Sequence, residues 1–254
     1  MDRGTKEEQD RRLILPRTPC AETSGAQLLD CLYSAEAGKL DKALPESYAI
    51  FDKLYDYPTD RFGLGRRVSA LPYVDGSTVT MPLQEALAQG LNDVPVLLQS
   101  MQAEMACSPV EEFQNLTEEG LKEFFARNFT PAYGPEAAAR IDAIYKSYSP
   151  PEYAVYAVDA DTGAACGLRH LARAAAQGFK HPVYWSTVVA GPSAPVDGLR
   201  FPYHSWDFEV ATGTYTDYKA SEQDLHLGAR ILDVWYELAT LGRVSEGAGG
   251  WMPV

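Results

Sequence analysis

Two short apolar runs constrain the fold of this chain more than any other feature of the sequence. The run from Val94 to Ser100 (VPVLLQS) shows no alternation of apolar and polar residues, which is typical of a strand buried on both faces of a parallel sheet. The run from Pro182 to Ala190 (PVYWSTVVA) is β-branched and aromatic, and predicts a second central strand. Because helical patterns separate and follow these runs, the sequence predicts an α/β fold.

Helical patterns fill much of the remaining chain. Segment 23–44 places Leu28, Leu29, Leu32 and Tyr33 on one helical face and is expected to form a short helix followed by another. Further helices are expected over 82–90, 117–129, 135–148, 163–177 and 221–241. Segments 48–67 and 192–216 are rich in Pro, Gly and aromatic residues and are predicted to be loops, and Asp75-Gly76 marks a tight turn.

Composition excludes several classes of function. The chain has 35 acidic against 22 basic residues, a formal net charge of -13, so it should repel nucleic acid. No apolar stretch is long enough for a transmembrane helix. The four histidines are scattered and the four cysteines form no CxxC pair, so we expect no metal site and no cofactor. Lone cysteines in a domain of this size are more often buried thiols than disulfides.

Two titratable residues stand out because of where they follow the predicted strands. Glu104 comes just after the first strand, and His204 lies in an aromatic stretch, FPYHSWDFEV, after the second. Parallel sheets place their sites at the carboxyl ends of strands, where a carboxylate beside a histidine would hold its tautomer. Taken alone, Glu104 also fits a solvated loop residue and His204 a hydrogen-bonded core residue. Asp207 fits a helix cap or an alternative partner of His204, and Asp161 fits an N-cap.

Several patterns follow one another in a fixed order. They are Pro72-Tyr-Val-Asp-Gly76, Val94-Pro-Val-Leu-Leu98, Gln102-Ala-Glu-Met105, Asp161 five residues before Cys166, Pro182-Val-Tyr-Trp185, His204-Ser-Trp-Asp207, and Trp235-Tyr-Glu-Leu-Ala239 with Gly242 and Trp251-Met-Pro253. In this order the chain resembles the carboxyl-terminal half of type-B carboxylesterases, the cholinesterase-like α/β-hydrolases, over about 19–253. The first 18 residues form a charged leader, and the esterase-like region is treated as one portion over 19–254.

The resemblance implies a partial α/β-hydrolase fold, the carboxyl-terminal half of a doubly wound, mostly parallel sheet with helices on both faces. It implies that Glu104 is the acid and His204 the histidine of a catalytic triad, with Ser205 and Asp207 beside them. It also implies a disulfide between Cys20 and Cys31, where many exported members of the family have one.

The chain departs from the family most clearly in what it lacks. The nucleophile elbow, G-x-S-x-G, does not occur, and the oxyanion-hole glycines that lie upstream in the family are missing as well. Smaller departures are Gln99, Met105 and Ser205, each where the family usually has glycine. The isolated chain is therefore predicted to be inactive, and Met1 is interpreted as lying inside a longer ancestral reading frame or as starting a chain separate from the amino-terminal half.

Two hypotheses follow from these matches and departures. In the first, the chain is part of a carboxylic ester hydrolase, and a partner or a missing segment supplies the serine and covers the sheet edge. In the second, it is a non-catalytic, esterase-like interaction or scaffold subunit of a larger assembly. A third interpretation, a self-sufficient hydrolase that uses Ser100 or Ser205, lacks an elbow at either serine.

The compartment stays open at this stage. The start of the chain lacks the apolar middle of a secretory signal. The family resemblance and the triplets Asn115-Leu-Thr117 and Asn128-Phe-Thr130, which would accept glycans in an exported protein, favour secretion.

Overall fold

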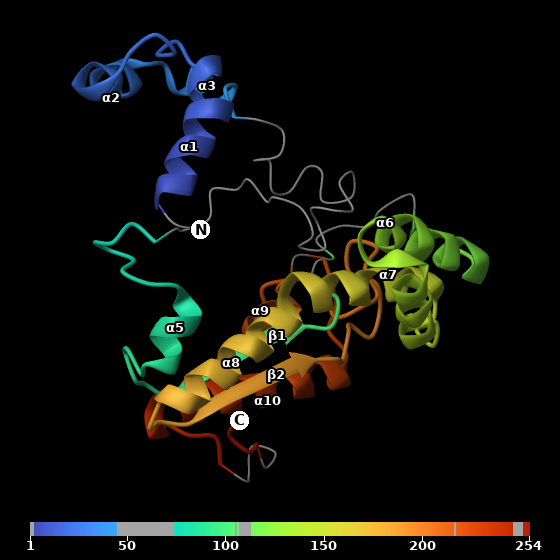
Figure 1. The fold of residues 1–254 in the computed structure, drawn as a ribbon. Helices are drawn as coiled ribbons and strands as arrows, with labels where there is room; N and C mark the ends of the chain where they lie inside the picture. The colour runs from blue at the N-terminus through green and yellow to red at the C-terminus, as the bar shows by residue number, and fades with distance from the viewer. Residues whose placement is uncertain (1–2, 45–73, 105, 107–112, 216, 246–250) are drawn as a thin grey trace. The chain divides into compact units, whose positions relative to one another are not determined.

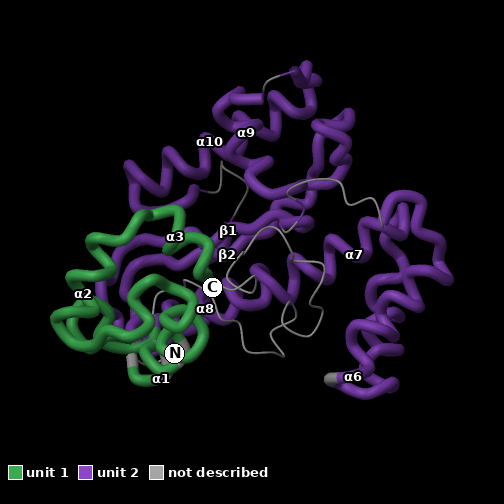
Figure 2. The backbone as a smooth tube through the Cα atoms, turned by 90° about the horizontal axis from the view of Figure 1, so that it is seen from above, with its two compact units in different colours: residues 1–82 green, residues 83–254 purple. Residues whose placement is uncertain are grey.

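The structure is a computed structural model that describes residues 3–44, 74–104, 106, 113–215, 217–245 and 251–254 (Figure 1). The predicted loop over 48–67, and residues Pro72, Tyr73, Met105 and Cys107, lie outside the described residues. The chain divides into two compact units, Met1–Pro82 and Leu83–Val254 (Figure 2). That residues 19–254 form one esterase-like portion stays a prediction.

The first unit has helices in its described amino-terminal part and turns and bends over 74–82. Its elements are α1 (Arg3–Leu13), a 3₁₀ turn η1 (Leu15–Arg17), α2 (Gly25–Ser34) and α3 (Ala37–Asp41). The prediction of a short helix followed by another over 23–44 is confirmed by α2 and α3. Cys20, which is fully buried, forms a disulfide with Cys31 of α2. Near the end of the unit, Asp75 turns the chain because its Oδ1 accepts the N–H groups of Ser77, Thr78 and Val79.

A two-stranded parallel sheet forms the centre of the second unit, and both predicted strands are confirmed. The strands β1 (Val96–Met101) and β2 (Val183–Val188) pair in register from Val96 opposite Val183 to Met101 opposite Val188. Their side chains alternate between the two faces of the sheet. Val96, Leu98, Val183 and Trp185 pack in one cluster with Ala172 and Ala175 of α8 (Cys166–Gly178).

The other face of the sheet packs against α10 (Glu222–Leu241). Leu97 and Tyr184 lie in a second cluster with Val234 and Trp235 of that helix. In Figure 1, α8 and α10 accordingly lie on opposite sides of β1 and β2. Short α5 (Leu83–Ala88) adds Leu87 to the cluster on the α8 face. The expected layering, a parallel pair of strands between helices, is therefore present, with most residues of the two strands half-buried.

The long connection from β1 to β2 is mostly helical. It contains α6 (Glu118–Tyr145), α7 (Pro151–Ala160) and a single π turn, η4 (Asp161–Ala165), that runs into α8. Gly134, with φ of 81°, breaks α6 at the place where the sequence predicted a gap between two helices. No pattern predicted α7, although residues 154–160 of it are all buried.

The prediction of a continuous loop over 192–216 is wrong in its second half. Residues Trp206–Thr212 form helix α9, whose buried side chains Trp206 and Val210 are one helical turn apart. The helix is too short for a helical period to be visible among the surrounding aromatic residues. α10 was predicted correctly, and a capping box between Ser221 and Asp224 closes its amino terminus.

Candidate active site

Glu104 lies on a tight turn directly after β1. Its backbone N–H donates to the carbonyl of Met101, and its Oε2 accepts the N–H of the same residue at 2.7 Å. The side chain therefore folds back onto the end of the strand that precedes it. This bond fixes one carboxylate oxygen, Oε2, and leaves Oε1 for another partner.

Backbone bonds join the Glu104 turn to the segment that carries His204. Ala103 donates to the carbonyl of Pro202 at 3.0 Å and forms a parallel bridge with Tyr203, while the N–H of His204 donates to Ala106 at 3.2 Å. The two strands end at the same edge of the sheet, so the segments beyond them continue the pairing for a few residues. Two residues separated by 100 positions in sequence are thereby brought together.

The His204 imidazole and the Glu104 carboxylate form a close pair. Nδ1 of His204 lies 2.6 Å from Oε1 of Glu104, and the two side chains are 53% and 19% exposed. Because a carboxylate accepts hydrogen bonds, this contact favours the tautomer with the proton on Nδ1. Nε2 is then a lone-pair acceptor at an exposed position, the arrangement that a general base requires.

Ser205 and Asp207, predicted beside this pair, take other roles in the geometry. Ser205 has φ of 68°, a left-handed conformation that starts α9. Within the described residues Asp207 forms no hydrogen bond with His204, and its Oδ2 accepts from Nε2 of Gln99 at 2.6 Å. Of the two carboxylates considered as partners of His204, the structure therefore brings only Glu104 to the imidazole.

No serine hydroxyl of the described residues is hydrogen-bonded to His204. Ser100 is 1% exposed within β1, and its hydroxyl has no partner among the described residues. The hydroxyl of Ser193 instead donates to Asp224, on the side of α10. Within the described part of the chain, the geometry thus provides an acid and a base but no bonded nucleophile.

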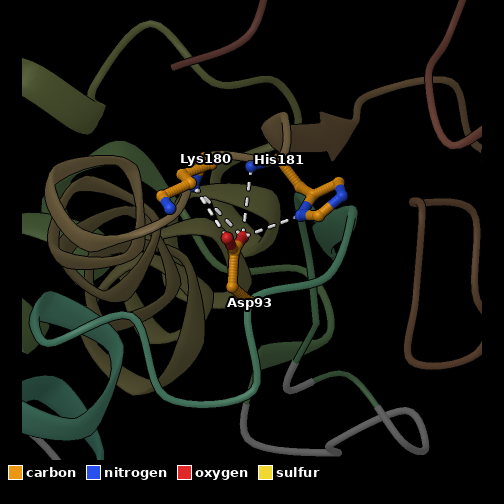
Figure 3. A network of polar contacts seen from close by, with 3 residues as sticks. All are labelled: Asp93, Lys180 and His181. Atoms are coloured by element: carbon orange, nitrogen blue, oxygen red, sulfur yellow. Dashed lines mark hydrogen bonds and ion pairs between the residues drawn. The ribbon is translucent and has the colours of Figure 1, made fainter.

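A second pair of histidine and carboxylate, Asp93 and His181, lies at the opposite ends of the strands (Figure 3). Its carboxylate accepts the backbone N–H groups of Lys180 and His181 as well as Nδ1 of His181, all at 3.0–3.1 Å. Desolvation opposes ionisation of this carboxyl group, but the His181 and Lys180 bonds outweigh it and lower the pKa of Asp93. The pair ties the segment before β1 to the segment before β2, which is a structural role.

Aromatic residues flank the turn between β1 and Glu104, and the sequence analysis did not single them out. Gln102 donates to the hydroxyl of Tyr148 and accepts from that of Tyr153 at 2.6 Å. Tyr153 stacks on Phe201 with ring centroids 4.3 Å apart. Desolvation raises the pKa of Tyr153, so its phenol stays neutral and continues to donate. The only signal in the sequence was the aromatic richness of 145–156, which indicates a core equally well.

The remaining expectations concern metals, membranes and Asp161. Among the described residues, no cluster of three or more His, Cys, Asp or Glu side chains suits a metal ion. None of the helices in the described ranges has the length and apolarity needed to cross a membrane. Asp161 does not bond to the start of α8 as an N-cap would, since its Oδ2 accepts from the hydroxyl of Tyr145.

Comparison with known proteins bears on the fold. No family model and no curated protein matches the chain. Among solved structures, the chain is similar to a PNB esterase, with 18% sequence identity and a TM-score of 0.62, over 100% of this chain and 48% of that one. The chain thus spans about half the length of the structure it matches. At this identity the likeness shows the fold: the chain has part of an α/β-hydrolase fold, as the sequence predicted.

Proposed function

We propose that this chain is the carboxyl-terminal part of a type-B carboxylesterase and supplies the acid and the histidine of a Ser-Glu-His triad for carboxylic ester hydrolysis. The contact of 2.6 Å between Nδ1 of His204 and Oε1 of Glu104 is the observation that carries this proposal. The α/β-hydrolase fold also supports the proposal, because Glu104 and His204 lie at the carboxyl ends of parallel strands, where such folds place their sites.

The pair has a defined part in the reaction. Glu104 holds the proton on Nδ1, so that Nε2 takes the proton of a serine hydroxyl as the hydroxyl attacks the ester carbonyl. The imidazolium that forms is stabilised by Glu104 and returns the proton to the leaving alcohol. A water molecule then releases the acyl group from the serine by the same proton transfers in the second half of the cycle.

The serine has to come from another segment or another chain. In the described residues, β1 pairs with β2 on one side only, so its second edge is available for a further strand. We propose that the partner covers this edge and carries both the nucleophile and the oxyanion hole.

Glu104→Gln in the assembled protein tests the mechanism. An amide at this position no longer favours the required tautomer, and turnover of an activated ester should fall about 10⁴-fold, by analogy with the known triad variant. Asp93→Asn is a matched control, because it changes a carboxylate bonded to a histidine at the opposite ends of the strands. A Glu104→Gln protein with near-normal turnover would remove Glu104 from the mechanism.

A serine-directed phosphonate locates the nucleophile in the same preparation. We expect the covalent label on a partner or on a segment containing G-x-S-x-G, and none on the 254 residues of this chain. Label on this chain would contradict the proposal.

The second candidate function is that of a non-catalytic scaffold subunit. It is favoured by one observation, that no described hydroxyl is bonded to His204. A co-purifying partner without G-x-S-x-G, together with an assembly that neither hydrolyses esters nor takes up the phosphonate, would support it over the esterase.

A further inference from the structure

Three polar side chains form a row that runs from β2 through β1 to the start of α9. Ser186 Oγ donates to Gln99 Oε1 at 3.1 Å, and Gln99 Nε2 donates to Asp207 Oδ2 at 2.6 Å. The second oxygen of Asp207 accepts the N–H of Phe208 at 2.8 Å. Ser186 and Gln99 are paired residues of the sheet. The row therefore crosses both strands close to the carboxyl end of β1, after which Glu104 follows.

The segment with His204 is therefore attached to β1 at two points. At one point Glu104 holds the imidazole, and at the other Gln99 holds Asp207, three residues further along the chain. Between them the backbone turns through Ser205 in a left-handed conformation, which this residue adopts only when its surroundings require it. The orientation of the His204 side chain relative to β1 thus depends on the position at which α9 begins.

We propose that Gln99 is a positioning residue for His204. By binding the Asp207 carboxylate to the sheet, it fixes the start of α9 and leaves Glu104 as the only carboxylate on the imidazole. This inference rests on the proposed function, since it assigns Gln99 a purpose in the same site. It also gives a reason for the side chain at a position where the resemblance leads one to expect glycine.

Physical chemistry explains why Asp207 has to be held. A partly buried carboxylate that loses its donor bears a desolvation penalty until it finds another. An imidazole three residues away is such a donor, and a bond from His204 to Asp207 would turn the ring away from Glu104. The Gln99 amide removes this alternative because it satisfies Asp207 Oδ2 and cannot be titrated.

Three variants test the positioning role of Gln99 by removing, opposing or exchanging the donor and acceptor of its bond to Asp207. Gln99→Ala removes the donor, and Gln99→Glu places two carboxylates against each other. The double variant Gln99→Glu with Asp207→Asn restores one donor and one acceptor in exchanged positions, and Ser186 can still donate to residue 99. Asp93→Ala is the matched control, since it breaks a polar clamp between the same two strand regions at their other ends.

The measurement is the long-range ¹H–¹⁵N correlation spectrum of the His204 ring in the full chain, assigned with a His204→Gln variant. It reports the tautomer and the bonding of the ring, which a change in overall stability does not alter. In Gln99→Ala and Gln99→Glu, the ratio of Glu104-bound to unbound ring should fall about fivefold, the effect of losing one net hydrogen bond of about 1 kcal/mol. The exchanged pair should restore the wild-type spectrum, and Asp93→Ala should keep it.

The outcomes separate this inference from the proposed function. Ring signals that stay at their wild-type positions in both Gln99 variants would overturn the positioning role, as would a spectrum that changes equally in Asp93→Ala. Because the spectrum needs no nucleophile, a ring that responds to Gln99 in an assembly without hydrolysis would leave the inference intact and refute only the esterase. Hydrolysis that depends on Glu104 but not on Gln99 would support the esterase and refute the positioning role of Gln99.

Discussion

Replacing Asp224 by asparagine should destabilise the second unit at neutral pH and much less in acid. Asp224 is 2% exposed at the start of α10, where it accepts hydrogen bonds from Tyr218, Ser221 and Ser193. Ser193 lies in the loop between β2 and His204, so this carboxylate anchors the loop to α10. It was not recognised from the sequence, because an acidic residue in the first helical turn is usually a solvated cap.

The magnitude follows from the pKa of the group. Burial alone would raise it, but the bonds from Ser193, Tyr218 and Ser221 outweigh burial and lower the pKa of Asp224 from 3.8 to about 2. One pKa unit corresponds to about 1.4 kcal/mol, which sets an upper limit of about 2.5 kcal/mol on the effect. Since Ser193 and its bond to Tyr218 are exposed to solvent, we expect about 1–2 kcal/mol after screening.

The direction of the pH dependence is fixed by the sign of the shift. A carboxyl group whose pKa is lower in the folded state stabilises the protein above the unfolded value, here 3.8, and loses this contribution as the pH falls through about 2. The free energies of unfolding of wild type and Asp224→Asn should therefore differ by about 1–2 kcal/mol at pH 6, and most of that difference should disappear by about pH 2.5.

Urea unfolding of both proteins at a series of pH values measures this difference directly. The comparison cancels all other carboxyl groups, because they titrate alike in both chains. A gap that is constant from pH 6 to pH 2.5 would show that Asp224 acts through packing and not through its charge, and would refute the reasoning.

Two further predictions concern the backbone around the site. Ser205→Gly should raise the free energy of unfolding by about 0.5–1 kcal/mol, because glycine adopts the left-handed conformation without strain; a loss in the same urea assay would assign the Ser205 side chain a role of its own. Gly228→Ala should lower it by about 2 kcal/mol or more, because the new Cβ would lie 2.2 Å from the carbonyl oxygen of Val210. Gly167→Ala in α8, where a Cβ meets nothing within 4 Å, is the matched control and should stabilise by about 0.5–1 kcal/mol; equal effects at the two glycines would contradict the close packing of α9 on α10.

The parts of the fold that the sequence predicts are those with a local signal. The apolar run around Leu97 and the β-branched run around Thr187 are strands because strands buried on both faces need such residues. Ser221 predicts the start of α10, since a capping hydroxyl satisfies free N–H groups at a helix end. The gap left between the helices expected over 117–129 and 135–148 contains Gly134, whose positive φ breaks α6.

The parts that were missed are held by tertiary contacts. Helix α9 exists because Trp206 is fully buried and its indole donates to the carbonyl of Ala190. Helix α7 is buried on all sides over 154–160, so its sequence shows no alternation of buried and exposed residues. In both segments, aromatic and small residues give no period that would distinguish a short helix from a loop.

The sequence predicted which two residues form the candidate site, but not the contacts that hold them in place. The resemblance selected Glu104 and His204, whereas the residues alone left Asp207 open as a helix cap or as an alternative partner of His204. In the structure Glu104 holds the imidazole while Asp207 accepts from Gln99, and the Gln99 bond depends on the register of β1 against β2 and on the position of α9. None of these is encoded in the local sequence around His204.

The edge of β1 limits what a partner that brings the nucleophile can look like. Val96 and Gln102 donate to Pro182 and Val188, so residues at alternate positions of β1 face β2 and those between them, Leu97, Gln99 and Met101, face the open edge. At Met101 that edge is already closed, because its N–H donates to Glu104. A partner strand can therefore pair with β1 at Leu97 and Gln99 and has to leave the sheet before Met101.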